Sequence, residues 1–176
     1  MASIDYDIDF VHSELGFSVV HLMITRTHGV FTKWAGRFAL DHAEPANSRI
    51  SVEIDASSVD TRNAQRDGHL RSPDFFDVAR FPTIRFEGRQ LVHTADTFTL
   101  FGDFTLHGVT RPLTFTLTGG QQAKDSQGRA RVGYRASATI SRRDFGITWS
   151  SVYEGGSVVV GDEVALVLDL QLIPRG

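Results

Sequence analysis

Apolar and polar residues alternate along most of this chain. In the segment 4–11, the apolar side chains of Ile4, Tyr6, Ile8 and Phe10 are separated by aspartates. A period of two sends alternate side chains to opposite faces of a β-strand. The pattern therefore predicts half-buried strands, about eight or nine in all. They are expected within the segments 4–11, 15–23, 30–40, 49–55, 83–88, 97–106, 113–119, 129–141 and 164–173.

Short turn signals separate many of these segments, which favours hairpins and antiparallel pairing. A long sheet with one continuous apolar face must close on itself or pack against a second sheet. About eight strands of roughly ten residues suit a barrel, whose interior holds side chains or one small ligand. A sandwich is the alternative, but long hairpin-linked strands favour the barrel. We therefore predict an all-β fold, an extended antiparallel eight-stranded barrel, as a single domain over residues 1–176.

Composition limits the classes of partner. The net charge is −3, and no basic stripe typical of a nucleic-acid binder is present, so we expect no nucleic acid. The chain has no cysteine. No apolar run approaches the ~18 residues of a membrane span, and the first ten residues lack the apolar core of a signal peptide. We expect no transmembrane segment and a cytoplasmic location, or a periplasmic one if a leader has been removed.

The expected inner face of the barrel mixes large and small side chains. Phenylalanine occurs 13 times, against 3 tyrosines and 2 tryptophans, and it brings bulk without a polar group. Such a face either fills the barrel completely or lines an apolar tunnel, and the alternation does not separate these alternatives. The residues predicted to line a tunnel are Phe17, Val19, His21, Trp34, Phe38, Val52, Ile54, Phe75, Phe76, Ile84, Phe86, Phe104, Phe115, Tyr134, Ala136 and Leu168.

The seven histidines form no pair with metal-ligand spacing, so we expect no metal site. His42 lies in a predicted turn and is expected to be solvated. His21 lies on an apolar strand face, where it is either a core group or a polar contact for a ligand. The triplet Asp144–Gly146 matches part of a kinase signature, but the other kinase motifs are missing and the match is rejected. Arg142 is either ion-paired or a site for an anionic group.

One stretch, "RDGHLRSPDFFDVARFP" at 66–82, interrupts the alternation. We predict a short helical crossing near residues 61–77, with Asp60 as N-cap and a second helical start at Ser72. Asp67 and His69 could form an acid–base pair, or they could belong to a polar connection that covers one end of the barrel. Phe75 and Phe76 cannot both face water cheaply, so they are expected to plug the barrel or to form a lid over a tunnel.

Several motifs together resemble the YceI-like family. They are "FVHSELGFSVVHLMITRTHGVFTKWAGRF", "RDGHLRSPDFFD" followed by "FPTIRF", "GDFTLHGVTRPLTFTL", "RRDFGI" and "VGDEVALVLDLQL", in that order over nearly the whole chain. The resemblance implies a lipocalin-like barrel with a long apolar cavity that takes up polyisoprenoid or similar amphiphilic lipids. It implies no catalytic residues.

The leading hypothesis is therefore a protein that carries or sequesters an isoprenoid-type lipid, for example a polyprenyl chain, a quinone or a prenyl phosphate. It would not be an enzyme and would need no cofactor other than the bound lipid. Two alternatives remain: an enzyme acting on isoprenoids through Asp67 and His69, and a barrel with a filled core. A homodimer is a further expectation. The candidates for contact with the lipid head group are His21, His69, Arg71 and Arg142.

Overall fold

The computed structural model describes residues 2–151 and 159–176, most of which lie in strands of one sheet. The strands are β1 (Ile4–Ile8), β2 (Glu14–His21), β3 (Thr25–Phe31), β4 (Trp34–Leu40), β5 (Arg49–Asp55), β6 (Val59–Asp60), β7 (Thr83–Thr94), β8 (Thr97–Leu106), β9 (Val109–Lys124), β10 (Ala130–Ser141) and β11 (Val160–Pro174). The helices are α1 (Ala64–Arg71) and the 3₁₀ turns Pro45–Asn47, Ala56–Ser58 and Arg142–Phe145.

The sheet closes into a barrel. β1 and β2 both pair with β11, while β4 and β3 continue the sheet beside β1 and β2. β6 in turn continues β5 along the same line of strands. We count β1 with β2, β3 with β4, and β5 with β6 as one bent strand each. The described part of the chain then forms eight antiparallel strands, each paired with its neighbour in sequence. The prediction of an eight-stranded antiparallel barrel is confirmed.

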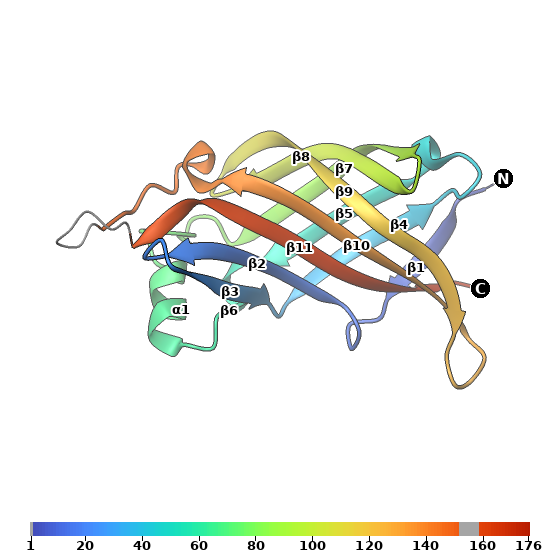
Figure 1. Ribbon diagram of the computed structural model, residues 1–176, viewed down its shortest axis with the longest axis horizontal. Helices are drawn as coiled ribbons and strands as arrows, with labels where there is room; N and C mark the ends of the chain where they lie inside the picture. Colours follow the sequence, from blue (N-terminus) through green and yellow to red (C-terminus); the bar gives the residue numbers. More distant parts are fainter. Residues whose placement is uncertain (1, 152–158) are drawn as a thin grey trace.

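The barrel is elongated, and its two ends differ (Figure 1). At one end the chain turns between β2 and β3 and between β8 and β9, and α1 lies across this end. Both termini lie toward the opposite end, which also holds the β4–β5 and β7–β8 connections. The alternation seen in the sequence sends one side-chain face of every strand inward, so the inner wall runs apolar between the two ends.

The helical crossing is present but begins later than predicted. The N-cap of α1 is Asn63, whose Oδ1 accepts a hydrogen bond of 2.9 Å from the Arg66 N–H. Asp60, the predicted cap, instead accepts from the Arg62 N–H. Ser72 ends the helix: its hydroxyl donates to the His69 carbonyl at 2.6 Å. The predicted second helical start at Ser72 is wrong, because the residues that follow form turns.

The long predicted strand 30–40 is broken at Thr32–Lys33. There the backbone N–H of Thr32 donates to the carbonyl of Ser58, and the Lys33 N–H donates to the Ser58 hydroxyl. The break shifts the inward face, so that Phe31, rather than Val30, points to the interior. A strict period of two cannot anticipate such a break, because it depends on hydrogen bonds to a distant segment.

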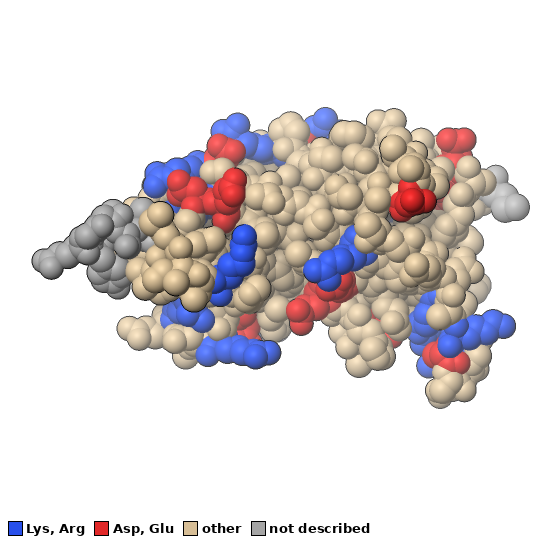
Figure 2. Space-filling view, viewed as in Figure 1, with Lys and Arg blue, Asp and Glu red and all other residues tan. Residues whose placement is uncertain are grey.

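Charged side chains of both signs are interspersed on the face drawn in Figure 2, without a large patch of one sign. In the ranges 2–151 and 159–176, no helix is long and apolar enough to cross a membrane.

Candidate functional site: an apolar cavity along the barrel

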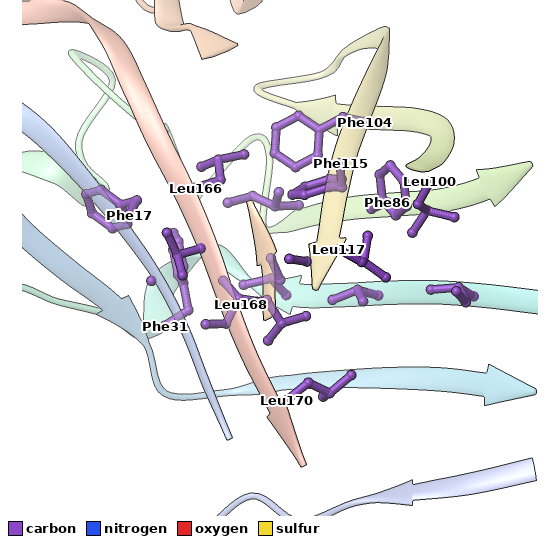
Figure 3. A pocket seen from close by; sticks show the side chains of 18 of the residues that line it. Phe17, Phe31, Phe86, Leu100, Phe104, Phe115, Leu117, Leu166, Leu168 and Leu170 are labelled. Atoms are coloured by element: carbon purple, nitrogen blue, oxygen red, sulfur yellow. The ribbon is translucent and has the colours of Figure 1, made fainter. Parts of the chain in front are cut away.

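An elongated cavity of about 210 Å³ occupies the barrel interior. Its lining reaches from Ile147 and Arg142 at the α1 end to His42 and Pro45 in the β4–β5 connection. The wall is almost entirely hydrocarbon, and the labelled side chains of Figure 3 show phenylalanines and leucines from many strands converging on the same space. A filled barrel would leave no such continuous space, so the geometry disfavours that alternative.

Strand register explains where the cavity has room. Across β10 and β11, Ala136 lies opposite Leu168 and Ala138 lies opposite Leu166. Pairing a small inward residue with a large one leaves free volume beside the alanine. Ala136, Leu166 and Leu168 are each only partly buried although they point inward, because part of their surface faces the hollow interior.

All the residues predicted to line a tunnel do line this cavity, except His21 and Trp34. Trp34 begins β4 just after the break at Thr32–Lys33, and its ring packs edge-on against Phe10 at 5.0 Å. His21 is the last residue of β2 and lies beyond Val19, the last lining position of that strand. Whether the lining residues contact a ligand stays a prediction.

The two adjacent phenylalanines close the α1 end from inside. Phe75 is buried and packs against the rings of His69 and Trp149, with ring centroids 5.0 and 5.3 Å away. Phe76 packs on Phe31 at 5.7 Å. Both phenylalanines line the cavity, so the turns that follow the polar helix α1 cover this end with an apolar cap.

The polar residues of the crossing hold α1 against the barrel. Asp67 is buried, and its Oδ1 accepts from the backbone N–H of Thr61 at 2.8 Å and from the Thr61 hydroxyl at 2.6 Å. Arg71 donates to the carbonyls of Ser57 and Val59. These side chains hydrogen-bond backbone N–H and carbonyl groups of the segment before α1, which need partners where the chain is buried.

Asp67 and His69 do not form a pair. The His69 Nε2 atom lies 2.8 Å from Asp74 Oδ2, while Asp67 is bonded to Thr61. Neither His69 nor Arg71 lines the cavity. The geometry therefore offers no support for an acid–base pair here, and it places two of the head-group candidates outside the cavity.

Arg142 does line the cavity, but its guanidinium is fully occupied. It donates to the carbonyls of Gly161, Ile147, Trp149 and Val160, and it lies 3.2 Å from an Asp162 carboxylate oxygen. An arginine has five N–H donors, so none is left for a head group. Burial lowers the pKa of Arg142, and the Asp162 carboxylate opposes that shift. Arg142 thus holds the residues after β10 and the start of β11 together through their carbonyl groups.

Polar groups also meet the cavity at the opposite end, in a connection that the sequence predicted only as a turn. His42 was expected to be solvated; it is exposed, but it also lines the cavity, and its Nε2 atom lies 2.7 Å from the Tyr6 hydroxyl. Tyr6 and His42 are 36 residues apart, so no local pattern joins them. Asp41 is buried beside them, and its Oδ1 accepts from the N–H groups of Ala43 and Glu44.

A closed antiparallel barrel around an apolar cavity defines a lipocalin-like class of protein. The YceI-like domain matches residues 6–172, and the chain belongs to this family.

Curated relatives include proteins described as "UPF0312 protein". The one from Pseudomonas savastanoi pv. phaseolicola is 39% identical over 146 residues, which cover 81% of this chain and 76% of the relative. The one from Pseudomonas fluorescens is 38% identical with the same coverage.

Solved structures share the fold. Burkholderia cenocepacia BcnA superposes with a TM-score of 0.82 at 21% identity and covers 94% of this chain and 99% of its own. The Campylobacter jejuni YCEI protein gives 0.74 at 26% identity, with 97% and 98% covered. A structure described as a polyisoprenoid binding domain, from Saccharophagus degradans, gives 0.69 at 16% identity, with 99% and 100% covered.

Proposed function

We propose that this protein binds an amphiphilic isoprenoid-type lipid in the barrel cavity and carries or sequesters it. The observation that supports the proposal most is the shape and chemistry of the cavity. It is long and narrow, and its wall is almost wholly aliphatic and aromatic. Burial of a long apolar chain there would supply most of the affinity, at ~25 cal/mol per Å² of apolar surface removed from water.

The comparisons support the same proposal. Family membership and the likeness to a polyisoprenoid binding domain agree with a lipid as the ligand. We further propose that the protein acts as a binder rather than an enzyme, since Asp67 and His69 are engaged by different partners. The bound lipid would be its one non-protein component. A homodimer and the cellular location stay predictions.

Mass spectrometry of an organic extract of the purified protein tests the proposal directly. We expect a long-chain lipid in near-stoichiometric amount. The variant Ala136→Trp should lose it, because an indole placed opposite Leu168 would fill the space that the chain needs. The matched control is Ser137→Trp, which adds the same ring one residue along β10 on the exposed outer face.

The proposal predicts at least a tenfold loss of lipid in Ala136→Trp and wild-type loading in Ser137→Trp, with both variants folded by circular dichroism. Lipid-free wild-type protein that also fails to take up added prenyl lipids would contradict it. So would equal loading of the two variants.

A further inference from the structure

The polar groups that line the cavity are few, and most are already bonded. They are Asp41, His42, Ser48, Tyr134 and Arg142. Asp41 accepts from two backbone N–H groups, the Ser48 hydroxyl accepts from the Asp41 N–H, and all donors of Arg142 are engaged. The Tyr134 hydroxyl, by contrast, makes no hydrogen bond to any residue that the structure describes. The Tyr134 oxygen keeps some accessible surface, so a bound ligand can accept a hydrogen bond from it.

The backbone around Tyr134 is shaped for this ring. The register between β9 and β10 shifts at Gly133/Tyr134, opposite Gly119 and Gly120. Gly119 and Gly120 both have positive φ, +112° and +86°, a conformation that side-chain-bearing residues rarely adopt. A Cβ on Gly119 would lie 2.4 Å from the Gly133 carbonyl oxygen, and one on Gly120 would lie 3.4 Å from the Tyr134 ring. Bulges of this kind re-aim a neighbouring side chain, here that of Tyr134.

Tyr134 belongs to the end of the cavity that also holds Tyr6 and His42. Its strand partner Leu170 lies two residues before Leu172 on β11, and Leu172 is paired with β1. Burial raises the pKa of the Tyr134 hydroxyl, and the nearby Tyr6 raises it further. The group therefore stays a neutral hydrogen-bond donor at physiological pH.

At this end the described cavity lining has no arginine or lysine to hold an anion. Among the lining residues, the one guanidinium is Arg142, which lies at the opposite end with no donor to spare, and no lysine is present. The carboxylate of Asp41 lies beside His42 and would repel a phosphate. A phosphate or diphosphate would thus be buried without a cation, which is strongly unfavourable.

We infer that the Tyr134 end of the cavity is a polar subsite for an uncharged oxygen, a carbonyl or a hydroxyl, at the end of the bound lipid. Tyr134 donates the hydrogen bond, and His42 lies at the opening beside it. This inference rests on the proposed function, because it assigns the head-group chemistry of the same cavity. It replaces the earlier head-group candidates His21, His69 and Arg71, which do not line the cavity.

The test is a titration of the full-length protein with three lipids of matched carbon count: geranylgeraniol, geranylgeranyl diphosphate and the hydrocarbon phytane. We expect the alcohol to bind more tightly than the hydrocarbon and at least as tightly as the diphosphate. In Tyr134→Phe, which removes only the hydroxyl, alcohol affinity should fall about 3- to 10-fold, toward that of phytane. Phytane affinity should change less than about twofold. The control Ser137→Ala, on the outer face of the same strand, should match wild type.

Two results would overturn the inference and leave lipid binding intact: tightest binding of the diphosphate, or unchanged alcohol affinity in Tyr134→Phe. An equal loss for alcohol and hydrocarbon would also overturn it, because that would mean the ring packs and does not donate. If none of the three lipids binds to the wild-type protein, the proposed function itself fails, and the subsite fails with it.

Discussion

The two ends of the barrel use polar residues in opposite ways. At the α1 end the sequence is dense with charge, yet Asp67, Arg71 and Arg142 are all satisfied by the protein itself. At the other end the sequence is unremarkable, yet Tyr134 has a donor to spare within the structure described. In this barrel, therefore, a dense cluster of charges is a poor guide to the ligand site, and a hydroxyl left free on the cavity wall is a better one.

We expect the greatest loss of stability when the Arg142 guanidinium is removed from the α1 end. Arg142→Met leaves the buried carbonyls of the β10–β11 connection without their donor, so we expect the free energy of unfolding to fall by about 3–5 kcal/mol. Arg143→Met is the control, because Arg143 is half-exposed and pairs with Asp162 at the surface. It should cost less than about 1 kcal/mol. Urea denaturation of both variants gives the comparison, and similar losses would show that Arg142 is no brace.

The next effect concerns the apolar cap. Phe75→Ala should lower the free energy of unfolding by about 3 kcal/mol, because the ring is buried against His69 and Trp149. Phe76→Ala should lower the free energy of unfolding by less, because Phe76 is only partly buried. Phe76 does pack on Phe17 and Phe31 over the cavity.

If lipid leaves past this cap, Phe76→Ala should raise the rate of transfer to acceptor vesicles about tenfold. An unchanged transfer rate would mean that the lipid exchanges at the Tyr134 end and that the cap is a fixed plug. Fluorescence of a labelled prenyl lipid gives the rate. Ser137→Ala, on the outer wall, provides the baseline for a variant that leaves both ends intact.

A smaller effect separates two neighbours in the polar crossing. Asp67→Ala removes the buried acceptor of two hydrogen bonds from Thr61 and should cost about 2 kcal/mol. His69→Ala removes a partly exposed contact with Asp74 and the edge contact with the Phe75 ring, and it should cost about 1 kcal/mol, less than Asp67→Ala. Neither should alter equilibrium lipid affinity by more than about twofold, since neither residue lines the cavity. A catalytic role would instead appear as prenyl-lipid turnover that disappears in His69→Ala.

The sequence predicted the barrel and most of its lining because the period of two is a local signal. Phe86, Phe104, Phe115 and Ala136 could be assigned to the inner face from their own strands alone. The exceptions depend on distant contacts. Trp34 keeps the parity of Phe38 on β4, but its ring packs against Phe10 and does not reach the lining.

The polar subsite could not be predicted for the same reason. His42 resembles any turn histidine until Tyr6, from another strand, lies against it. The adjacent glycines at 119 and 120 were the one local signal, since paired glycines inside a strand pattern suggest a bulge. What faces such a bulge depends on the register with β10, which the sequence does not specify.

The smallest expected effect tests the loop that positions His42. The pKa of Asp41 is lowered, chiefly by the hydrogen bond that it accepts from the Glu44 N–H. The carboxyl therefore stays ionised to a lower pH in the folded protein than in the unfolded chain. The stability it contributes is therefore present above the unfolded pKa of about 3.9 and is lost as pH falls through the lower folded value. Asp41→Asn should lower Tm by a few degrees at pH 7, and the difference should shrink near pH 3.

Glu44→Gln is the matched control, because Glu44 contributes its backbone N–H to this loop and the substitution removes only the side-chain charge. It should leave Tm within about a degree of wild type at both pH values. A deficit in Asp41→Asn that stays constant with pH would mean that packing, rather than the ionised carboxylate, holds the loop. In that case the Asp41 carboxylate would not be needed to position His42. The polar subsite would then be set by Tyr134 and the bulge at Gly119 and Gly120.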